Sequence, residues 1–207
     1  MPRSFARITS LTVFDFLLAA CCVGFGAGAG EPGDDQKSVK PAKPAAARFP
    51  NVAHVAGIDF VYYNDPKPGR FFLPEIMGGG CAWLDFDGDG WPDLYFVNGC
   101  ALPHDPQDRT HTSALYRNLG NGRFIEVGSL AGVDHNGYGQ GTTSADFDND
   151  GFADLVVTTW GQNTLYRNNG DGTFHAEPEG AGLHAPGPRW YLGAAPGDAD
   201  RDGNLDL

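Results

Sequence analysis

The sequence predicts an all-β fold made of repeated four-stranded antiparallel sheets. Its 207 residues include 30 glycines and 15 prolines, with aromatic and β-branched residues in short runs between them. This composition is typical of short strands joined by many turns. An acidic turn also occurs three times, and a second motif occurs twice. Such self-similarity indicates a repeat architecture.

The acidic turn begins at Asp85, Asp146 and Asp198. In each copy aspartate stands at positions 1, 3, 5 and 9, glycine at position 6 and leucine at position 10. Four carboxylates this close repel one another unless a cation lies among them. A hard ion that takes about six to eight oxygen ligands suits them, which favours calcium over magnesium. A solvated acidic turn is the alternative for one copy, but three copies in register favour a metal.

We therefore predict Ca²⁺ as the bound ion. Its ligands would be the side chains at positions 1, 3, 5 and 9 and the backbone carbonyl at position 7. Glycine at position 6 permits the positive φ that folds the turn around the ion. The predicted ligands are Asp85, Asp87, Asp89, Trp91, Asp93, Asp146, Asp148, Asp150, Phe152, Asp154, Asp198, Asp200, Asp202, Asn204 and Asp206.

An EF-hand loop starts with the same spacing, but it closes with a glutamate at position 12 and lies between helices. Here position 12 is Phe96 in the first copy and Val157 in the second. The flanking residues 78–84 and 94–97 are rich in glycine and aromatic residues, which suits strands and opposes helices. The turns therefore join two strands, and the aspartate at position 9 closes the site.

A second motif follows the first two turns. Residues 115–118 and 165–168 both read Leu-Tyr-Arg-Asn, and each is followed by a Gly-X-Gly turn that leads into Phe124 or Phe174. Each unit then holds four antiparallel strands, the size of one propeller blade. We predict an incomplete β-propeller over residues 49–207, with about two full blades plus partial ones. The blades would start near residues 79, 140 and 192.

The unit resembles the FG-GAP (VCBS-type) repeat of integrin α-like propellers. Residues 74–80, Pro-Glu-Ile-Met-Gly-Gly-Gly, leading into Asp85 are most similar to the cartilage acidic protein family and its bacterial relatives. In that family the aspartates at positions 1, 3, 5 and 9 and the carbonyl at position 7 bind calcium. Family members act mostly in recognition, such as adhesion, matrix contact and ligand capture.

The same resemblance predicts that the sequence is an N-terminal fragment. Relatives usually carry about seven blades, often followed by a smaller C-terminal domain. Residues 49–58 align with residues 124–133 and 174–183, which are the outermost strand of a blade and its exit. Residues 49–52 are therefore expected to form a fourth strand.

The net charge of −12 is concentrated in the acidic turns. From Phe49 onward there are 22 acidic residues, of which 12 belong to the turns, and the remaining 10 nearly balance eight Lys and Arg. Nothing in this distribution supports binding to nucleic acid or attraction to anionic membranes.

The first 30 residues are predicted to be a signal peptide. Arg3 and Arg7 precede an apolar stretch from Leu11 to Gly30, which is typical of an export leader and too short and glycine-rich for a membrane span. Residues 18–21 resemble a bacterial lipobox, so a lipid anchor at Cys21 is an alternative and would be the one membrane contact. Residues 31–48 are rich in proline, alanine and lysine and are predicted to be a disordered linker. We expect a secreted, periplasmic or cell-surface protein.

Cys81 and Cys100 remain after such processing, and export permits a disulfide. If the hairpin pairs Leu84 with Leu94, however, Cys81 falls opposite Val97 and not opposite Cys100. Both a disulfide formed through a bulge and two buried thiols are therefore open.

Residues 59–77 and 99–113 are insertions with no counterpart in the other units, and the strand directions place them on the face opposite the acidic turns. Long loops on a rigid scaffold often carry function, so a protein or glycan partner is expected there, although spacers are the alternative. His104 and His111 are expected to be solvated. The side chains available in the insertions are Tyr62, Tyr63, Arg70, Phe71, Phe72, His104, Asp105, Asp108, Arg109 and His111. The aromatic residues expected in the core between blades are Trp83, Tyr95, Phe96, Trp160 and Tyr166.

Two alternative functions are consistent with these features of the sequence. The first is an exported, calcium-stabilised and non-catalytic recognition or adhesion module, in which calcium binding is coupled to folding. The second is part of an exported propeller enzyme, a polysaccharide lyase or hydrolase, whose catalytic residues lie outside this sequence. No nucleophile–base pair, nucleophile elbow or zinc motif is recognisable in the sequence.

Overall fold

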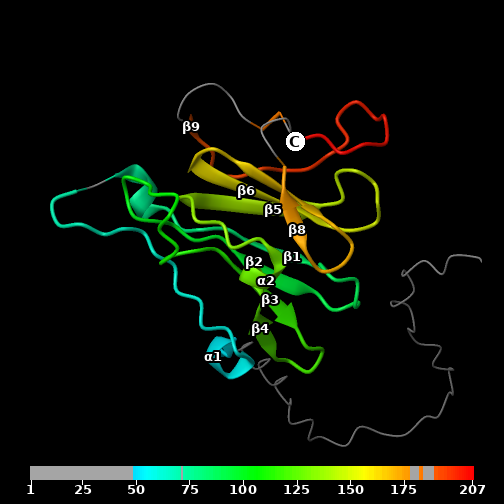
Figure 1. The fold of residues 1–207 in the computed structure, drawn as a ribbon, viewed down its shortest axis with the longest axis horizontal. Coiled ribbons are helices and arrows are strands. Elements are labelled where there is room, and N and C mark those ends of the chain that lie inside the picture. Colours follow the sequence, from blue (N-terminus) through cyan, green and yellow to red (C-terminus); the bar gives the residue numbers. More distant parts are fainter. Residues whose placement is uncertain (1–48, 71, 178–181, 184–188) are drawn as a thin grey trace, which may run out of the picture. The chain divides into compact units, whose positions relative to one another are not determined.

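The computed structural model describes residues 49–70, 72–177, 182–183 and 189–207, which all belong to one compact unit, Arg48–Leu207 (Figure 1). The predicted signal peptide, the lipobox cysteine Cys21 and the predicted linker lie outside the described residues. Among the helices of the described part, none combines the length and the apolar character needed to cross a membrane.

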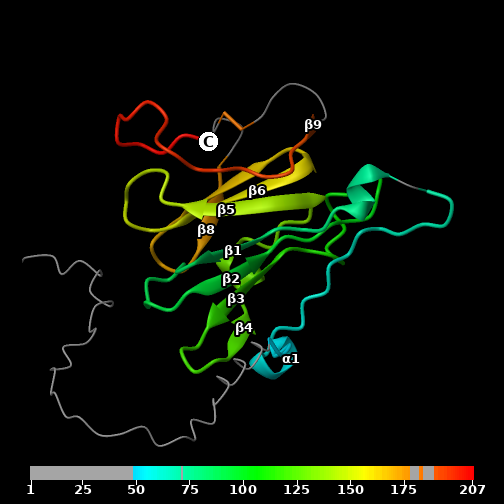
Figure 2. The ribbon, with the colours of Figure 1, turned by 180° about the vertical axis from the view of Figure 1, so that it is seen from behind.

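Two four-stranded antiparallel sheets form the body of this unit, which confirms the predicted all-β fold of blade-like sheets. In the first sheet the strands lie in sequence order, and consecutive strands pair with each other (Figures 1 and 2). Its strands are β1 (Cys81–Leu84), β2 (Asp93–Phe96), β3 (Ala114–Asn118) and β4 (Phe124–Glu126).

The second sheet repeats this topology. A short ninth strand, β9 (Arg189–Trp190), pairs with the far end of β6 through Trp160↔Trp190. Beyond it, an isolated bridge joins Gly197 to Asp206 across the third acidic turn. The four main strands of the second sheet are β5 (Gly139–Ala145), β6 (Asp154–Gly161), β7 (Thr164–Asn168) and β8 (Phe174–Ala176).

The hydrophobic core lies between the two sheets. β6 is buried along six consecutive residues, Asp154–Thr159, because the apolar and β-branched run Leu-Val-Val-Thr-Thr suits a strand covered on both faces. Glycines allow the sheets to meet closely, since a Cβ on Gly80 would lie 2.9 Å from Cα of Gly141. The core combines residues of both sheets and of the connection between them: Leu84, Phe86, Tyr95, Val97, Leu115, Val133, Leu155, Val157, Tyr166 and Phe174.

The aromatic residues divide between core and surface. Tyr95 and Tyr166 are buried between the two sheets, as predicted. Phe96 is half-buried, but it packs against Phe60 and Tyr116 in a second cluster of the first sheet and not between the blades. The prediction was wrong for Trp83 and Trp160, which are 57% and 45% exposed. Side chains along β1 point alternately to the two faces of the sheet, so Trp83 points outward while Ala82 and Leu84 point into the core. Trp160 lies beyond the stretch of β6 that pairs with β7.

The first hairpin differs by one residue from the predicted register. Leu84 pairs with Asp93, and Trp83 pairs with Leu94. The reason is that Asp93 is itself the first residue of β2, where its carboxylate accepts hydrogen bonds from backbone N–H groups. Cys81 consequently lies opposite Phe96, and both cysteines are free, with Cys81 exposed and Cys100 buried. Of the two alternatives, neither a disulfide nor a pair of buried thiols is seen.

Residues 49–52 do not form the predicted strand. The aligned strands β4 and β8 each pair with the preceding strand of their own sheet, and no described strand offers that pairing to residues 49–52. The rest of the alignment holds. Helix α1 (Ala53–Ala56) and helix α2 (Gly128–Ala131) occupy matching positions, and both end at a glycine with positive φ.

The two insertions pack against each other at the end of the first sheet opposite the acidic turns. Asp65, which is 1% exposed, receives hydrogen bonds from the Tyr63 hydroxyl (2.9 Å) and from the backbone N–H of Leu102 (2.8 Å), and it pairs closely with Arg70. Arg70 also donates to Glu75 Oε1 at 2.7 Å. Residue 71, one of the side chains expected to be available, lies outside the described residues.

Candidate calcium centres

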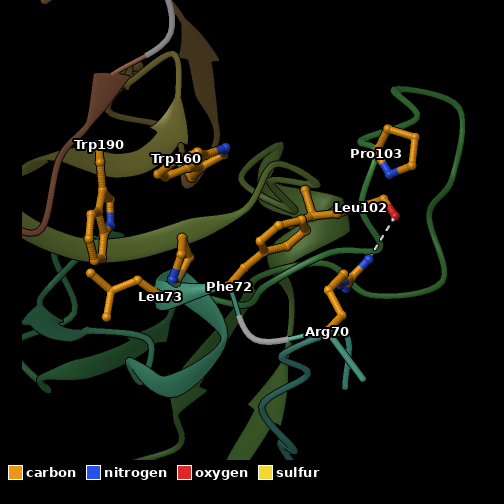
Figure 3. A pocket seen from close by; sticks show the side chains of 8 residues that line it. Arg70, Phe72, Leu73, Leu102, Pro103, Trp160 and Trp190 are labelled. Atoms are coloured by element: carbon orange, nitrogen blue, oxygen red, sulfur yellow. Dashed lines mark hydrogen bonds between the residues drawn. The ribbon is translucent and has the colours of Figure 1, made fainter. Parts of the chain in front are cut away.

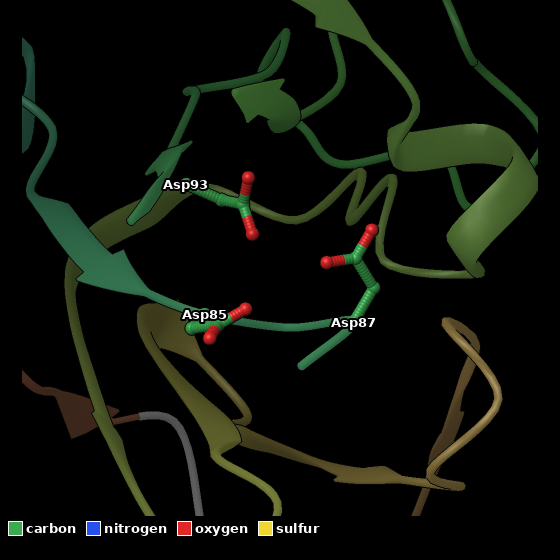
Figure 4. A group of neighbouring side chains, drawn as sticks. All are labelled: Asp85, Asp87 and Asp93. Atoms are coloured by element: carbon green, nitrogen blue, oxygen red, sulfur yellow. The ribbon is translucent and has the colours of Figure 1, made fainter. Parts of the chain in front are cut away.

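Each acidic turn gathers three carboxylates around a common point. In every copy one oxygen from each aspartate at positions 1, 3 and 9 lies within 4.8 Å of the other two. In the first turn the carboxylates of Asp85, Asp87 and Asp93 converge from both sides of the loop (Figure 4). We call these groups cage 1 (Asp85, Asp87, Asp93), cage 2 (Asp146, Asp148, Asp154) and cage 3 (Asp198, Asp200, Asp206).

The strands position the cages. Asp85 directly follows β1 and Asp93 begins β2, while Asp146 and Asp154 bear the same relation to β5 and β6. Because the two strands are paired, the first and ninth residues of each turn are brought opposite each other. Asp93 and Asp154 are fully buried, so the inner side of cages 1 and 2 belongs to the core, whereas all three aspartates of cage 3 are exposed.

Backbone N–H groups hold the carboxylates in the same way three times. The position-1 carboxylate accepts a hydrogen bond from the position-6 glycine, at 2.9 Å from Gly90 and Gly151 and at 3.1 Å from Gly203. The position-9 carboxylate accepts one from the N–H of position 2, at distances between 2.9 and 3.1 Å. These bonds fix the direction of the carboxylate oxygens in the folded turn.

The aspartates at position 5 lie outside the three-oxygen groups. Asp89, Asp150 and Asp202 instead accept hydrogen bonds from the backbone N–H of position 7 at 2.8–2.9 Å, which tightens the turn. The predicted positive φ of the position-6 glycine is confirmed, with values of 85° to 95°. Position 4 also has positive φ, at 60° in Asn149 and 66° in Arg201, which the aspartate spacing did not indicate.

An arginine from the Leu-Tyr-Arg-Asn motif lies beside each of the first two cages. Arg117 Nε is 2.6 Å from Asp87 Oδ2, a charge contact without hydrogen-bond alignment, and Arg117 Nη2 is 3.1 Å from Asp89. Arg167 Nη1 donates to Asp154 Oδ2 at 2.6 Å and lies 3.6 Å from Asp148. From sequence the motif was predicted only as a strand, although the repeated arginine was a signal for the contact.

Burial and neighbouring charges shift the pKa values of some of the turn aspartates. Burial, with the nearby charges of Asp87 and Asp89, raises the pKa of Asp93 to about 6, against backbone hydrogen bonds that lower it. Burial likewise raises the pKa of Asp148, and Asp154 and Asp150 add to this rise. In the exposed third turn the hydrogen bonds of Asn204 lower the pKa of Asp202.

The donor set fits a hard cation. The three converging ligands of each cage are carboxylate oxygens, with no sulfur or nitrogen among them, and this chemistry suits Ca²⁺ better than zinc or copper. A divalent ion would stabilise the ionised form of Asp93, which burial and the nearby charges of Asp87 and Asp89 disfavour. The carboxylates that converge to hold calcium are those of the aspartates at positions 1, 3 and 9. The predicted roles of the position-5 aspartates and of the backbone carbonyls at position 7 stay predictions.

The turns also contact the neighbouring repeat. Asn168 at the end of β7 donates to the carbonyl of Phe86 in the first turn at 2.8 Å. Asn149 in the second turn donates to Asn204 Oδ1 in the third at 3.1 Å. An ion that orders one turn would therefore also order its contact with the next repeat.

The predicted partner residues of the insertions are largely engaged in internal contacts. The Tyr63 and His111 rings stack with their centroids 3.6 Å apart, and Arg109 pairs with Asp134. His104 and Asp105 are exposed.

The FG-GAP-like repeat family matches this sequence in two overlapping copies, residues 85–157 and residues 146–207. Each copy begins at the first aspartate of an acidic turn, and together they cover more than half of the chain. The chain belongs to the FG-GAP-like repeat family. The predicted resemblance is thereby confirmed, and the four-stranded sheets with acidic turns are its repeats.

A mouse protein, cartilage acidic protein 1 (Mus musculus), is similar to part of this FG-GAP-like chain. The two sequences are 43% identical over 54 residues, which is 25% of this chain and 8% of the mouse protein. The chain thus matches a small part of that relative.

Proposed function

We propose that this FG-GAP-like chain is an exported, non-catalytic recognition module whose repeats are stabilised by calcium. The observation that carries the proposal is the convergence of carboxylates at positions 1, 3 and 9 in three successive turns. Some acidic residues elsewhere in the unit form ion pairs, as Asp65 and Glu75 do with Arg70. The three-carboxylate cages carry more negative charge than the neighbouring arginines neutralise, and a divalent ion would balance it.

Calcium would act structurally. Its binding to the cages would be coupled to folding of the turns, and the contacts of Asn168 and Asn149 with adjacent turns would extend this order from repeat to repeat. Extracellular modules need only about 10⁻⁴–10⁻³ M affinity for calcium, which agrees with cages that are partly neutralised by arginine.

Recognition would use the insertions on the end opposite the cages. Both of their arginines are paired, Arg70 with Asp65 within an insertion and Arg109 with Asp134 in the connection after α2. This pairing supports a rigid binding surface over acid–base catalysis, which needs an unpaired base or nucleophile with an orienting partner. Degradation of a polysaccharide by the purified chain would contradict this part of the proposal.

Thermal unfolding with and without calcium tests the proposal. We expect calcium to raise the melting temperature by several degrees relative to chelator, since a ligand that binds only the folded state stabilises it. Asp87→Ala and Asp148→Ala should each reduce the rise, because each removes one ligand from a different cage. Asp105→Ala, which removes an exposed aspartate outside the turns, is the matched control. An identical melting temperature in calcium and chelator would overturn the proposal.

A further inference from the structure

Trp160 stands between two hollows on the insertion side of the second sheet. Its indole is 45% exposed and makes an edge contact with Trp190, with ring centroids 5.9 Å apart. One hollow, of about 650 Å³, is apolar and includes Phe72, Leu73 and the two tryptophans (Figure 3). A hollow of this size is in the range of small-ligand sites, which combine aromatic walls with a few placed polar groups.

The second hollow supplies the polar groups. It has a volume of about 430 Å³, also in that range, and is lined by Trp160 together with His104, His135, Asn136, Gln162 and Thr164. Asn136 donates its amide to the carbonyls of Pro106 and Asp108, so its Oδ1 remains as an acceptor. The side chain of Gln162 can both donate and accept.

His135 offers a buried polar atom without a protein partner. Its Nδ1 lies 3.2 Å from the Tyr166 hydroxyl, whereas its Nε2 has essentially no exposed surface and no hydrogen-bond partner among the described residues. Unpartnered buried polar atoms are unfavourable. Burial, with the nearby charges of His104 and Arg109, lowers the pKa of His135 to about 4, so the imidazole is neutral at pH 7 and adds no charge to the wall of the hollow.

Neither hollow selects for charge. Beside the polar hollow, Arg109 pairs with Asp134, and Arg70 in the wall of the apolar hollow is neutralised by Asp65 and Glu75. The ligand that fits is therefore neutral, with an apolar face for the indole and several hydroxyl groups at its edge. A pyranose ring has this form. A proline-rich peptide would use the apolar hollow and leave the polar groups of the second one unpaired.

We propose that the polar hollow beside Trp160 binds a pyranose unit of a neutral glycan, with the C–H face of the ring on the indole and its hydroxyls on Gln162 and Asn136. This proposal rests on the proposed recognition function and names its ligand class. Trp160 is then the stacking platform, and the two amides orient the ring.

Ligand-observed NMR with methyl β-glucopyranoside, methyl β-galactopyranoside and methyl α-mannopyranoside tests it, on the full chain with calcium. We expect at least one of these sugars to bind with a Kd of about 1–10 mM. Trp160→Ala should weaken binding at least tenfold, and Gln162→Ala, in the loop after β6, should weaken it severalfold. Trp83→Ala removes another exposed indole, from β1, and this variant should bind the sugars as the unmodified chain does.

Three results would overturn the proposal: none of the sugars binds, Trp160→Ala binds as well as the unmodified chain, or decaproline binds through Trp160 while the sugars do not. Calcium-dependent melting of the same samples separates the two proposals. If calcium stabilises the chain and no sugar binds, the glycan site fails while the calcium-stabilised module stands.

Discussion

Arg167 Nη1 lies 2.6 Å from Oδ2 of Asp154, a carboxylate with no exposed surface that begins β6 and completes cage 2. The equivalent arginine of the first repeat, Arg117, contacts Asp87 and Asp89 on the outer side of cage 1. The same motif thus places a guanidinium beside two cages but at different carboxylates. In cage 2 the positive charge is closest to the buried ligand, where it competes most directly with a cation.

Arg167→Met should therefore strengthen calcium binding in cage 2 and weaken the calcium-free fold. Without the guanidinium, an ion at the cage meets less repulsion, and we expect its Kd to fall roughly tenfold or more. In chelator the variant should lose about 3 kcal/mol of unfolding free energy, because a buried carboxylate loses its partner. Calorimetric calcium titration and urea unfolding in chelator and in calcium measure the two effects.

Arg117→Met is the matched control for that experiment. Arg117 is 40% exposed and contacts carboxylates that are themselves 14% and 28% exposed, so the solvent screens its charge and both effects should be smaller. Weaker calcium binding in Arg167→Met than in the unmodified chain would show that the arginine supports the ion and does not compete with it.

Calcium binding in cage 1 should weaken on acidification through the pKa of Asp93, about 6. A proton on this buried carboxyl competes with the ion, so we expect about tenfold weaker binding at pH 5 than at pH 7. Calcium titrations at pH 7, 6 and 5 test this, with Asp93→Asn showing how much of the pH dependence belongs to the other cages. A pH-independent affinity would contradict the role of Asp93.

Without calcium the pH effect has the opposite sign. The folded-state pKa of Asp93 lies above its ordinary value of 3.8. Protonation of Asp93 therefore favours the fold below about pH 4, and this contribution is lost as the pH rises through about 6. In chelator, Asp93→Asn should flatten this part of the stability profile, because asparagine carries no charge to bury.

Much of the fold could be predicted because its signals are local. The acidic turns, the repeated Leu-Tyr-Arg-Asn strands and the glycine turns each define a strand end, and the four-stranded sheets follow from their order. The register of the first hairpin differed by one residue because Asp93 belongs to β2. The exposure of Trp83 depends on the alternation of side chains along β1, and the exposure of Trp160 depends on where the pairing of β7 with β6 ends.

The sequence spacing was enough to predict the aspartates of the candidate site, but not the residues that contact them. Positions 1, 3 and 9 converge because a hairpin brings its ends together, a property that the spacing alone contains. Position 9 contributes to the three-carboxylate group and position 5 does not. This difference depends on which carboxylate accepts a hydrogen bond from which backbone N–H. The arginine contacts and the hollows beside Trp160 join segments far apart in the chain, which no local pattern specifies. The assignment of the aspartates as calcium ligands stays a prediction.

Asp65→Asn should loosen both insertions. Burial favours the neutral form of Asp65, but hydrogen bonds from Arg70, Leu102 and Tyr63 outweigh it and hold the pKa at about 2. Removing the charge leaves Arg70 partly unpaired, and we expect a loss of about 3 kcal/mol in unfolding free energy. Hydrogen exchange should become faster at residues 100–112, with Asp105→Asn as control.

Because Asp65 stabilises the fold in its ionised form, the stability of the protein should also decrease in strong acid. Since its folded-state pKa of about 2 lies below the ordinary 3.8, its stabilising contribution is complete above about pH 4 and is lost as the pH falls through 2. Unchanged exchange rates in Asp65→Asn would mean that the insertions are held by their aromatic contacts, such as Tyr63 on His111.

Gly90→Ala should destabilise the first turn through backbone conformation alone. Gly90 has a φ of 85°, and a Cβ there would meet no atom within 4 Å. The left-handed conformation costs an alanine about 1 kcal/mol, and the shift of the Gly90 N–H away from Asp85 Oδ2 would also weaken cage 1. Gly78→Ala is the matched control, because Gly78 has equal space without a positive φ and alanine there should be neutral or slightly stabilising. Urea unfolding in chelator and in calcium measures both variants. Equal stabilities would show that the turn relaxes to accept the new side chain, whereas a larger loss for Gly90→Ala in calcium would tie its backbone shape to ion binding.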